Sequence, residues 1–158
     1  MIPDHIFRAY DVRGIYGSDL TEEVAERIGL AFGCYAGGSG RRVAVGMDVR
    51  LSSPSLKRAF VEGLVKAGCR VVDVGLVPTP ALYYAVASRG LDGGTMVTAS
   101  HNPPEWNGFK LCVKGAAVVA EGMGMEELKA LAQNPKPSEL RERGEVVVEE
   151  GFLDDYLG

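Results

Sequence analysis

Short apolar runs alternate with longer amphipathic stretches along this chain, and this alternation restricts the fold more than any other feature. The runs over residues 42–48, 70–75 and 94–99 are too short for helices and suit buried strands. Helix-type patterns over residues 53–68 and 78–90 separate them. Strands that alternate with helices predict βαβ units. We therefore expect an α/β fold, a three-layer α/β/α domain whose mixed, mostly parallel sheet has helices on both faces.

Capping residues give the expected helix boundaries. Thr21 is a suitable N-cap for a helix within residues 20–38, and Ser53 before Pro54 is typical of an N-cap followed by a first helical residue. We assign Ser53 and Pro54 no chemistry. The first helix has an apolar face formed by Val24, Ile28, Phe32 and Tyr35. Each helix therefore has a face suited to packing on the sheet.

Length and composition limit the number of domains and the class of partner. With 158 residues, we expect one domain over residues 1–150, followed at 151–158 by the start of a linker or helix into a second domain. The net charge of −4 and the lack of a basic stripe argue against nucleic acid. No apolar run approaches the roughly 20 residues of a membrane span. Three widely spaced cysteines favour neither disulfides nor zinc, so we expect a cytoplasmic protein.

Three polar clusters are expected at the carboxyl ends of strands, where α/β sheets bind ligands. They contain Asp11 and Arg13, then Asp48 and Arg50, then Ser100, His101 and Asn102. Lys110 follows ten residues after Ser100, and an Asn107-Gly108 turn closing a hairpin would bring this lysine beside the serine. A serine surrounded by arginines, a lysine and a histidine suits a group that carries or receives phosphate.

Each cluster also has an alternative structural interpretation. An Asn-Pro-Pro loop is most often only a turn, and Arg13 and Arg50 could be surface residues paired with nearby aspartates. Other serine chemistries fit poorly, because Ser100 lacks a G-x-S-x-G setting and the chain lacks a phosphate-binding P-loop and a G-x-G-x-x-G sequence. His101 is a poor base for the adjacent Ser100, because neighbouring side chains on extended backbone point apart.

The stretch TASHNPPEWNGFK, residues 98–110, resembles the phosphoserine loop of the α-D-phosphohexomutases. FRAYDVRGIYG, residues 7–17, resembles the opening of their phosphomannomutase/phosphoglucomutase branch. The D-x-R-x-S sequence at 48–52 and the PTP at 78–80 also match in order, so the resemblance covers essentially the whole chain.

The resemblance implies a phosphoserine at Ser100 that exchanges its phosphoryl group with a hexose phosphate through a bisphosphorylated sugar. The implied catalytic residues are Ser100, Lys110, Arg13 and His101, and the implied substrate- or phosphate-binding residues are Tyr10, Arg50 and Asn102. Magnesium would be bound through the phosphate on Ser100 and aspartates elsewhere, and a hexose 1,6-bisphosphate would act as activator. Hexose phosphates and the remaining domains of a longer enzyme are the implied partners.

The chain also departs from the family pattern. It resembles only the first domain of family members and lacks the Asp-Gly-Asp-x-Asp-Arg metal loop and the sugar-reading segments. We therefore expect it to be inactive as a mutase by itself, and to self-associate through surfaces that later domains would cover. Phosphoglucosamine mutase ranks second, because that branch usually carries serine where Thr98 stands. A non-catalytic phosphosugar-binding module is the other alternative, and the preferred sugar stays undecided.

Overall fold

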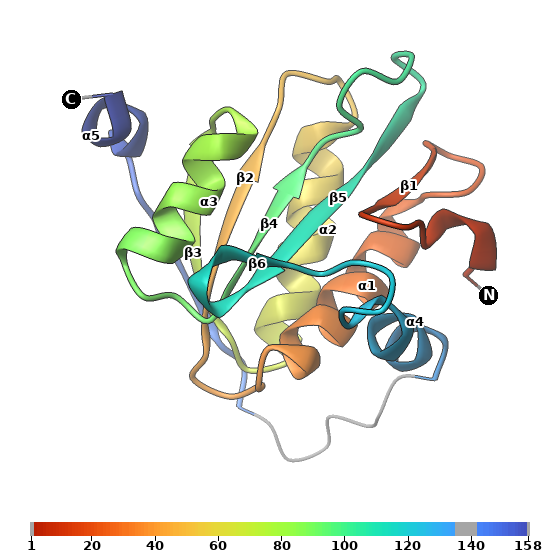
Figure 1. Ribbon diagram of the computed structural model, residues 1–158, viewed down its shortest axis with the longest axis horizontal. Coiled ribbons are helices and arrows are strands. Elements are labelled where there is room, and N and C mark those ends of the chain that lie inside the picture. Colours follow the sequence, from red (N-terminus) through yellow and green to blue (C-terminus); the bar gives the residue numbers. More distant parts are fainter. Residues whose placement is uncertain (1, 135–141, 158) are drawn as a thin grey trace.

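The computed structural model describes residues 2–134 and 142–157, in which helices lie on both sides of one sheet (Figure 1). The strands are β1 (Val12–Ile15), β2 (Arg42–Met47), β3 (Arg70–Leu76), β4 (Gly93–Val97), β5 (Trp106–Val113), β6 (Ala117–Val118) and β7 (Glu145–Val148). The α-helices are α1 (Glu22–Tyr35), α2 (Ser53–Lys66), α3 (Thr79–Ser88), α4 (Met125–Gln133) and α5 (Phe152–Leu157). Two short 3₁₀ turns are η1 (Asp4–Ile6) and η2 (Lys114–Ala116).

The sheet is mixed, and its strand order is β1-β5-β4-β2-β3-β7, with β6 also paired to β5. Strand β2 is parallel to β3 and β4, and β3 is parallel to β7. Strand β5 is antiparallel to its three partners β1, β4 and β6. Among the described strands, therefore, only β5 runs against the others. This confirms the prediction of a mixed, mostly parallel sheet.

Two apolar cores lie on opposite faces of the sheet, which gives the three layers expected from the sequence. Helices α1, α2 and α4 contribute to the larger core, where the rings of Phe60 and Phe109 have centroids 4.7 Å apart. Helices α3 and α5 cover the other face, where Leu82 and Met96 are buried. Within the described residues, no helix has the length and apolarity needed to cross a membrane.

Helices α1 and α2 approach each other closely because glycine stands at their crossing. A Cβ atom at Gly63 would lie 2.1 Å from the carbonyl oxygen of Glu26, and one at Gly29 would lie 2.2 Å from that of Phe60. No real Cβ contact is so short, so a side chain at either position would force the helices apart. The crossing sets the position of α2 on the sheet. It thereby also sets the position of the loop that connects β2 to α2.

Of the predicted helix caps and the predicted hairpin turn, the structure confirms the first cap and places the second cap and the turn elsewhere. The predicted N-cap of α1 is confirmed, since Thr21 accepts a hydrogen bond from the Val24 N–H at 3.2 Å. The N-cap of α2 is Ser52, so the prediction of Ser53 in that position was wrong by one residue. The predicted Asn107-Gly108 turn was also wrong, because both residues lie inside β5. The turn between β4 and β5 is instead formed by the residues before Trp106, where Pro103 and Pro104 interrupt strand pairing.

The last described helix packs back onto this domain. Phe152 of α5 is buried in the core beneath α3, and the guanidinium of Arg89 lies 4.9 Å from the centre of its ring. Tyr84 and Tyr156 meet edge to face, with centroids 5.4 Å apart. The sequence prediction that residues 151–158 begin a linker stays a prediction, but the described part of this segment contributes a core side chain here.

Candidate active site

Ser100 is presented on the loop that follows the fully buried strand β4. It is exposed, and its backbone has a φ of 56°, the left-handed region that side-chain-bearing residues rarely adopt. The Ser100 N–H donates to Thr98 Oγ1 at 3.0 Å, and the Asn102 N–H donates to the Ala99 carbonyl at 3.1 Å. Such backbone persists only where its surroundings hold it, and it concentrates at functional sites. The loop therefore holds the serine out in a defined conformation.

A chain of polar contacts connects this loop to β1 and β5. The Arg13 guanidinium donates to Asn102 Oδ1 at 2.5 Å and, through Nε, to Asp11 Oδ1 at 3.0 Å. The other oxygen of Asp11 lies 3.5 Å from Lys110 Nζ. Asp11 is 3% exposed, so one buried carboxylate orients both cations. The structure thus brings together Arg13, Asn102 and Lys110, three residues predicted from separate parts of the sequence.

The pairing of β1 with β5 explains why Arg13 can reach the loop. Arg13 is in register with Gly108, and a Cβ atom at Gly108 would lie 2.0 Å from the Val12 carbonyl oxygen. Glycine is therefore required by the close approach of β1, and not by a turn. Lys110 is in register with Met96 of β4, so the predicted hairpin exists even though its turn lies earlier.

Arg50, at the carboxyl end of β2, reaches across to the same loop. Its four terminal N–H groups donate to main-chain carbonyls of the loop. These belong to Ser100, Asn102, Pro103 and Trp106, at distances of 2.8, 2.8, 2.8 and 3.1 Å. The Arg50 Nε lies 3.3 Å from Asp48 Oδ2, an ion-pair distance, although its geometry is too poor for a hydrogen bond. The phosphate-binding role that the family resemblance implies for Arg50 stays a prediction.

A buried polar network lies next to Arg50, and the sequence predicts no role for it. The Ser53 hydroxyl donates to Asp48 Oδ1 at 2.7 Å, and the Asn107 amide donates to the hydroxyls of Ser52 and Ser53 at 2.8 and 3.0 Å. Both Ser53 and Asn107 are completely buried. The D-x-R-x-S sequence pointed to part of this network, but Asn107 was mistaken for a turn residue because Asn-Gly is so common in hairpin turns.

The remaining predicted residues lie at the exposed rim. His101 is exposed on the loop, and Tyr10 is 73% exposed just before β1. The contacts that join Arg13, Asn102, Asp11 and Lys110 include neither of them. Trp106 begins β5 and has the Arg8 guanidinium 5.2 Å from its ring centre. It therefore anchors the end of the loop.

The charges at this edge suit an anionic group. Arg13 and Lys110 share the one carboxylate of Asp11, and His101 adds a further potential cation. On α3, burial raises the pKa of Tyr83 above 10.0, and nearby Cys112 and Asp11 raise it further. In the described part of the chain, no three His, Cys, Asp or Glu side chains are grouped so that they could hold a metal ion. These residues alone do not fit a resident Mg²⁺.

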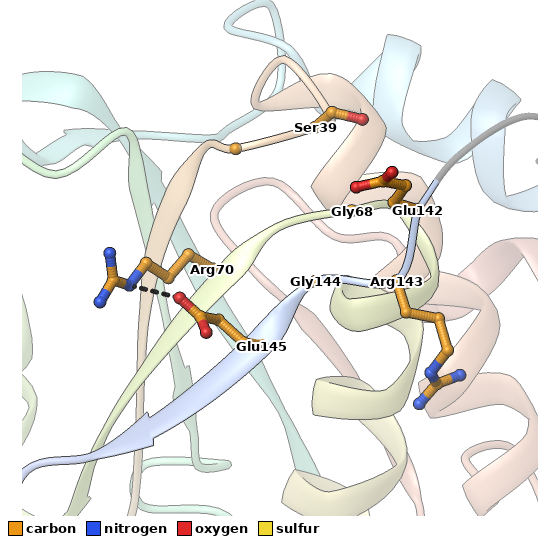
Figure 2. Close-up of a pocket in the computed structure, with 8 residues that line it drawn as sticks. Ser39, Gly68, Arg70, Glu142, Arg143, Gly144 and Glu145 are labelled. Carbon is orange, nitrogen blue, oxygen red and sulfur yellow. Dashed lines mark ion pairs between the residues drawn. The ribbon is translucent and has the colours of Figure 1, made fainter.

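A cavity of about 700 Å³ lies at the opposite end of the strands (Figure 2). It is lined by the first residues of β3 and β7, Arg70 and Glu145, which form an ion pair at 3.1 Å, and by Ser39 and Glu142. None of the predicted site residues lines it. The polar loop around Ser100 is therefore the candidate active site.

Comparison with known proteins identifies the family of this chain. The chain is 44% identical over 157 residues to a phosphomannomutase/phosphoglucomutase of Pseudomonas putida, covering 99% of this chain and 33% of that protein. It is 41% identical over 141 residues to a phosphomannomutase of Vibrio cholerae, covering 87% of this chain and 30% of that protein. The chain thus spans about a third of the length of the curated relatives it matches.

Among solved structures, a phosphoglucomutase/phosphomannomutase family protein of Burkholderia thailandensis superposes with a TM-score of 0.86 at 38% identity. This match covers 99% of the present chain and 35% of the other. Residues 4–137 match the family model for phosphoglucomutase/phosphomannomutase, alpha/beta/alpha domain I. The chain therefore belongs to the phosphoglucomutase/phosphomannomutase family, of which it represents domain I.

Proposed function

We propose that this chain is the phosphate-carrying unit of a hexose-phosphate mutase, with Ser100 as the carrier. The observation that carries the proposal is the exposed Ser100, with its left-handed backbone, on a loop whose Asn102 accepts a hydrogen bond from Arg13. Asp11 pairs this arginine with Lys110. The names of the similar proteins support the reaction class, since they are phosphomannomutases and phosphoglucomutases. A phosphoserine there would interconvert hexose 1-phosphates and 6-phosphates.

The proposed exchange is a phosphoryl transfer in two halves. A hydroxyl oxygen of the bound hexose phosphate attacks the phosphorus on Ser100, and the bond from phosphorus to Ser100 Oγ breaks with its electron pair left on Oγ. The hydroxyl proton is lost to a base, and Oγ takes up a proton. In the second half, Oγ attacks the other phosphate of the bisphosphorylated sugar by the same steps in reverse. The serine is thereby rephosphorylated and the sugar phosphate has changed position.

The roles of individual residues follow from charge and place. We assign Lys110 and Arg13 to stabilising the transferring phosphoryl group and to proton transfer, because both cations approach the loop while anchored on Asp11. His101 and Asn102 directly follow the phosphate carrier in the chain, and the exposed ring of Tyr10 suits contact with the sugar. Preformed cations need little reorganisation as charge develops, which is the main source of catalysis in phosphoryl transfer.

Magnesium and partners are part of the proposal. A phosphate on Ser100 would supply one ligand to Mg²⁺, which neutralises phosphoryl charge when bound, and its other ligands would come from outside this chain. Further domains of a longer enzyme are the proposed partners, together with hexose phosphates and a hexose 1,6-bisphosphate activator. Exposed apolar side chains beside the site, at Val49 (81%) and Leu51 (101%), favour association with such domains or between copies. The cytoplasm is the proposed location.

Turnover of glucose 1-phosphate, measured by a coupled assay for glucose 6-phosphate, tests the proposal. We expect no turnover by the 158-residue chain, and turnover by a chain extended to the length of its relatives. Ser100→Ala should abolish activity of the extended chain, whereas Ser39→Ala, at the far end of the sheet, should leave it unchanged. An active Ser100→Ala variant would refute the role of Ser100 as the phosphate carrier.

A further inference from the structure

The loop that carries Ser100 makes few hydrogen bonds within itself, so contacts from outside the loop must hold its conformation. Its two prolines donate no N–H, and Ser100 has an unfavourable backbone conformation. The carbonyl groups of residues 100, 102, 103 and 106 all point toward one side chain, that of Arg50. Four acceptors from one turn therefore converge on a single guanidinium.

The four terminal N–H groups of this guanidinium all bind carbonyl groups of the loop. The fifth donor, Nε, makes no hydrogen bond, but it is buried at an ion-pair distance of 3.3 Å from Asp48 Oδ2, so a phosphate cannot reach it. A guanidinium has five N–H donors and no acceptor. No donor is therefore left to hold a phosphate, and the Arg50 side chain is only 12% exposed.

The anchor beneath Arg50 is itself rigid. Asp48 accepts from the Arg50 backbone N–H at 3.1 Å and from the buried Ser53 hydroxyl at 2.7 Å. Ser53 in turn accepts from Asn107 of β5 at 3.0 Å. The carboxylate that faces Arg50 is thus fixed by the start of α2 and by β5, the strand that follows the loop.

We propose that Arg50 is a positioning residue: it holds the Ser100 loop in the geometry needed for phosphoryl transfer and does not itself bind the phosphate. The effect of Arg50 on phosphoryl transfer rests on the proposed function of Ser100. The holding of the loop stands on the geometry alone.

Two measurements on Arg50→Ala, Arg50→Lys and the matched control Arg143→Ala test the inference. Arg143 also donates two N–H groups to protein, in its case to the Glu62 carboxylate at 2.8 and 2.9 Å, but it lies far from the loop. The first readout is the ¹⁵N order parameter of residues 100–102. We expect about 0.85 in the wild type and in Arg143→Ala, and below about 0.6 in Arg50→Ala. Arg50→Lys should lie between, because an ammonium cannot present a planar fork.

The second readout is the rate at which Ser100 takes up phosphate from glucose 1,6-bisphosphate. We expect at least a roughly tenfold loss in Arg50→Ala, since several charge-assisted hydrogen bonds are removed. Millimolar methylguanidinium should restore much of the rate, and methylammonium should not. Unchanged loop order in a folded Arg50→Ala protein, or in Arg50→Lys if Arg50→Ala does not fold, would overturn the inference. If the wild type takes up no phosphate, the proposed function fails and the order parameters still decide the role of Arg50.

Discussion

Replacing Asp11 tests the charge cluster that orients Arg13 and Lys110. Asp11 is 3% exposed and lies 3.0 Å from Arg13 Nε and 3.5 Å from Lys110 Nζ. At an effective dielectric constant of about 20, each attraction amounts to about 5 kcal/mol before desolvation. The two cationic side chains keep 29% and 25% exposure, so water screens them and the net effect is smaller. We expect Asp11→Ala to cost about 2–3 kcal/mol, at or below the usual range for breaking a buried pair.

Urea unfolding followed by circular dichroism measures this loss, and thermal unfolding should show a fall in Tm of about 5–10 °C. Asp11→Asn keeps an acceptor for Arg13 and should lose about half as much. Asp92→Asn is the control, because its carboxylate lies 4.0 Å from the more exposed Arg41. A Tm for Asp11→Ala within about 1 °C of the wild type would refute the view that Asp11 holds both cations.

Three further predictions concern stability and reactivity. Hydrogen bonds from the Tyr16 hydroxyl, and to a smaller extent from the Ser55 hydroxyl, lower the pKa of Glu22 from its ordinary 4.5. Ionised Glu22 therefore stabilises the fold above about pH 4.5, and this stability is lost as the pH falls through the pKa of the folded state. Glu22→Gln should therefore flatten the acid side of a plot of unfolding free energy against pH. Burial raises the pKa of Cys112 to about 12, so iodoacetamide at pH 8 should label it only after urea is added, as peptide mapping would show. Gly63→Ala should cost about 2–3 kcal/mol in urea unfolding, because its Cβ would clash with α1; unchanged stability would argue against the close crossing.

The layers of the fold, and the residues that gather at the candidate site, were largely predictable from local patterns. Strand and helix periods and the Thr21 cap depend on neighbours close in sequence, so they can be predicted directly. The polar residues predicted after β2 and β4 do follow those strands, but the prediction that Asp11 and Arg13 follow a strand was wrong, because Asp11 precedes β1 and Arg13 lies within it. The Ser100 loop was found because proline, asparagine and histidine after a buried strand are unusual as well as family-like.

Tertiary contacts decided what could not be predicted. Asn107-Gly108 has the composition of a hairpin turn, but the approach of Val12 and the amide bonds to Ser52 and Ser53 place it within β5. The phosphate-binding role that the resemblance implies for Arg50 stays a prediction, whereas its carbonyl partners could not be predicted because they lie about fifty positions away in the sequence. The shared carboxylate of Asp11 likewise depends on β1 meeting β5, which only the assembled sheet provides.

The most direct test of the central claim is whether Ser100 accepts phosphate. The purified chain would be incubated with glucose 1,6-bisphosphate or mannose 1,6-bisphosphate, and its intact mass and phosphopeptides measured against Ser100→Ala. The account predicts one added phosphoryl group, located on Ser100 in the wild type and absent from the variant. A phosphoryl group on another residue, or equal uptake by Ser100→Ala, would contradict it.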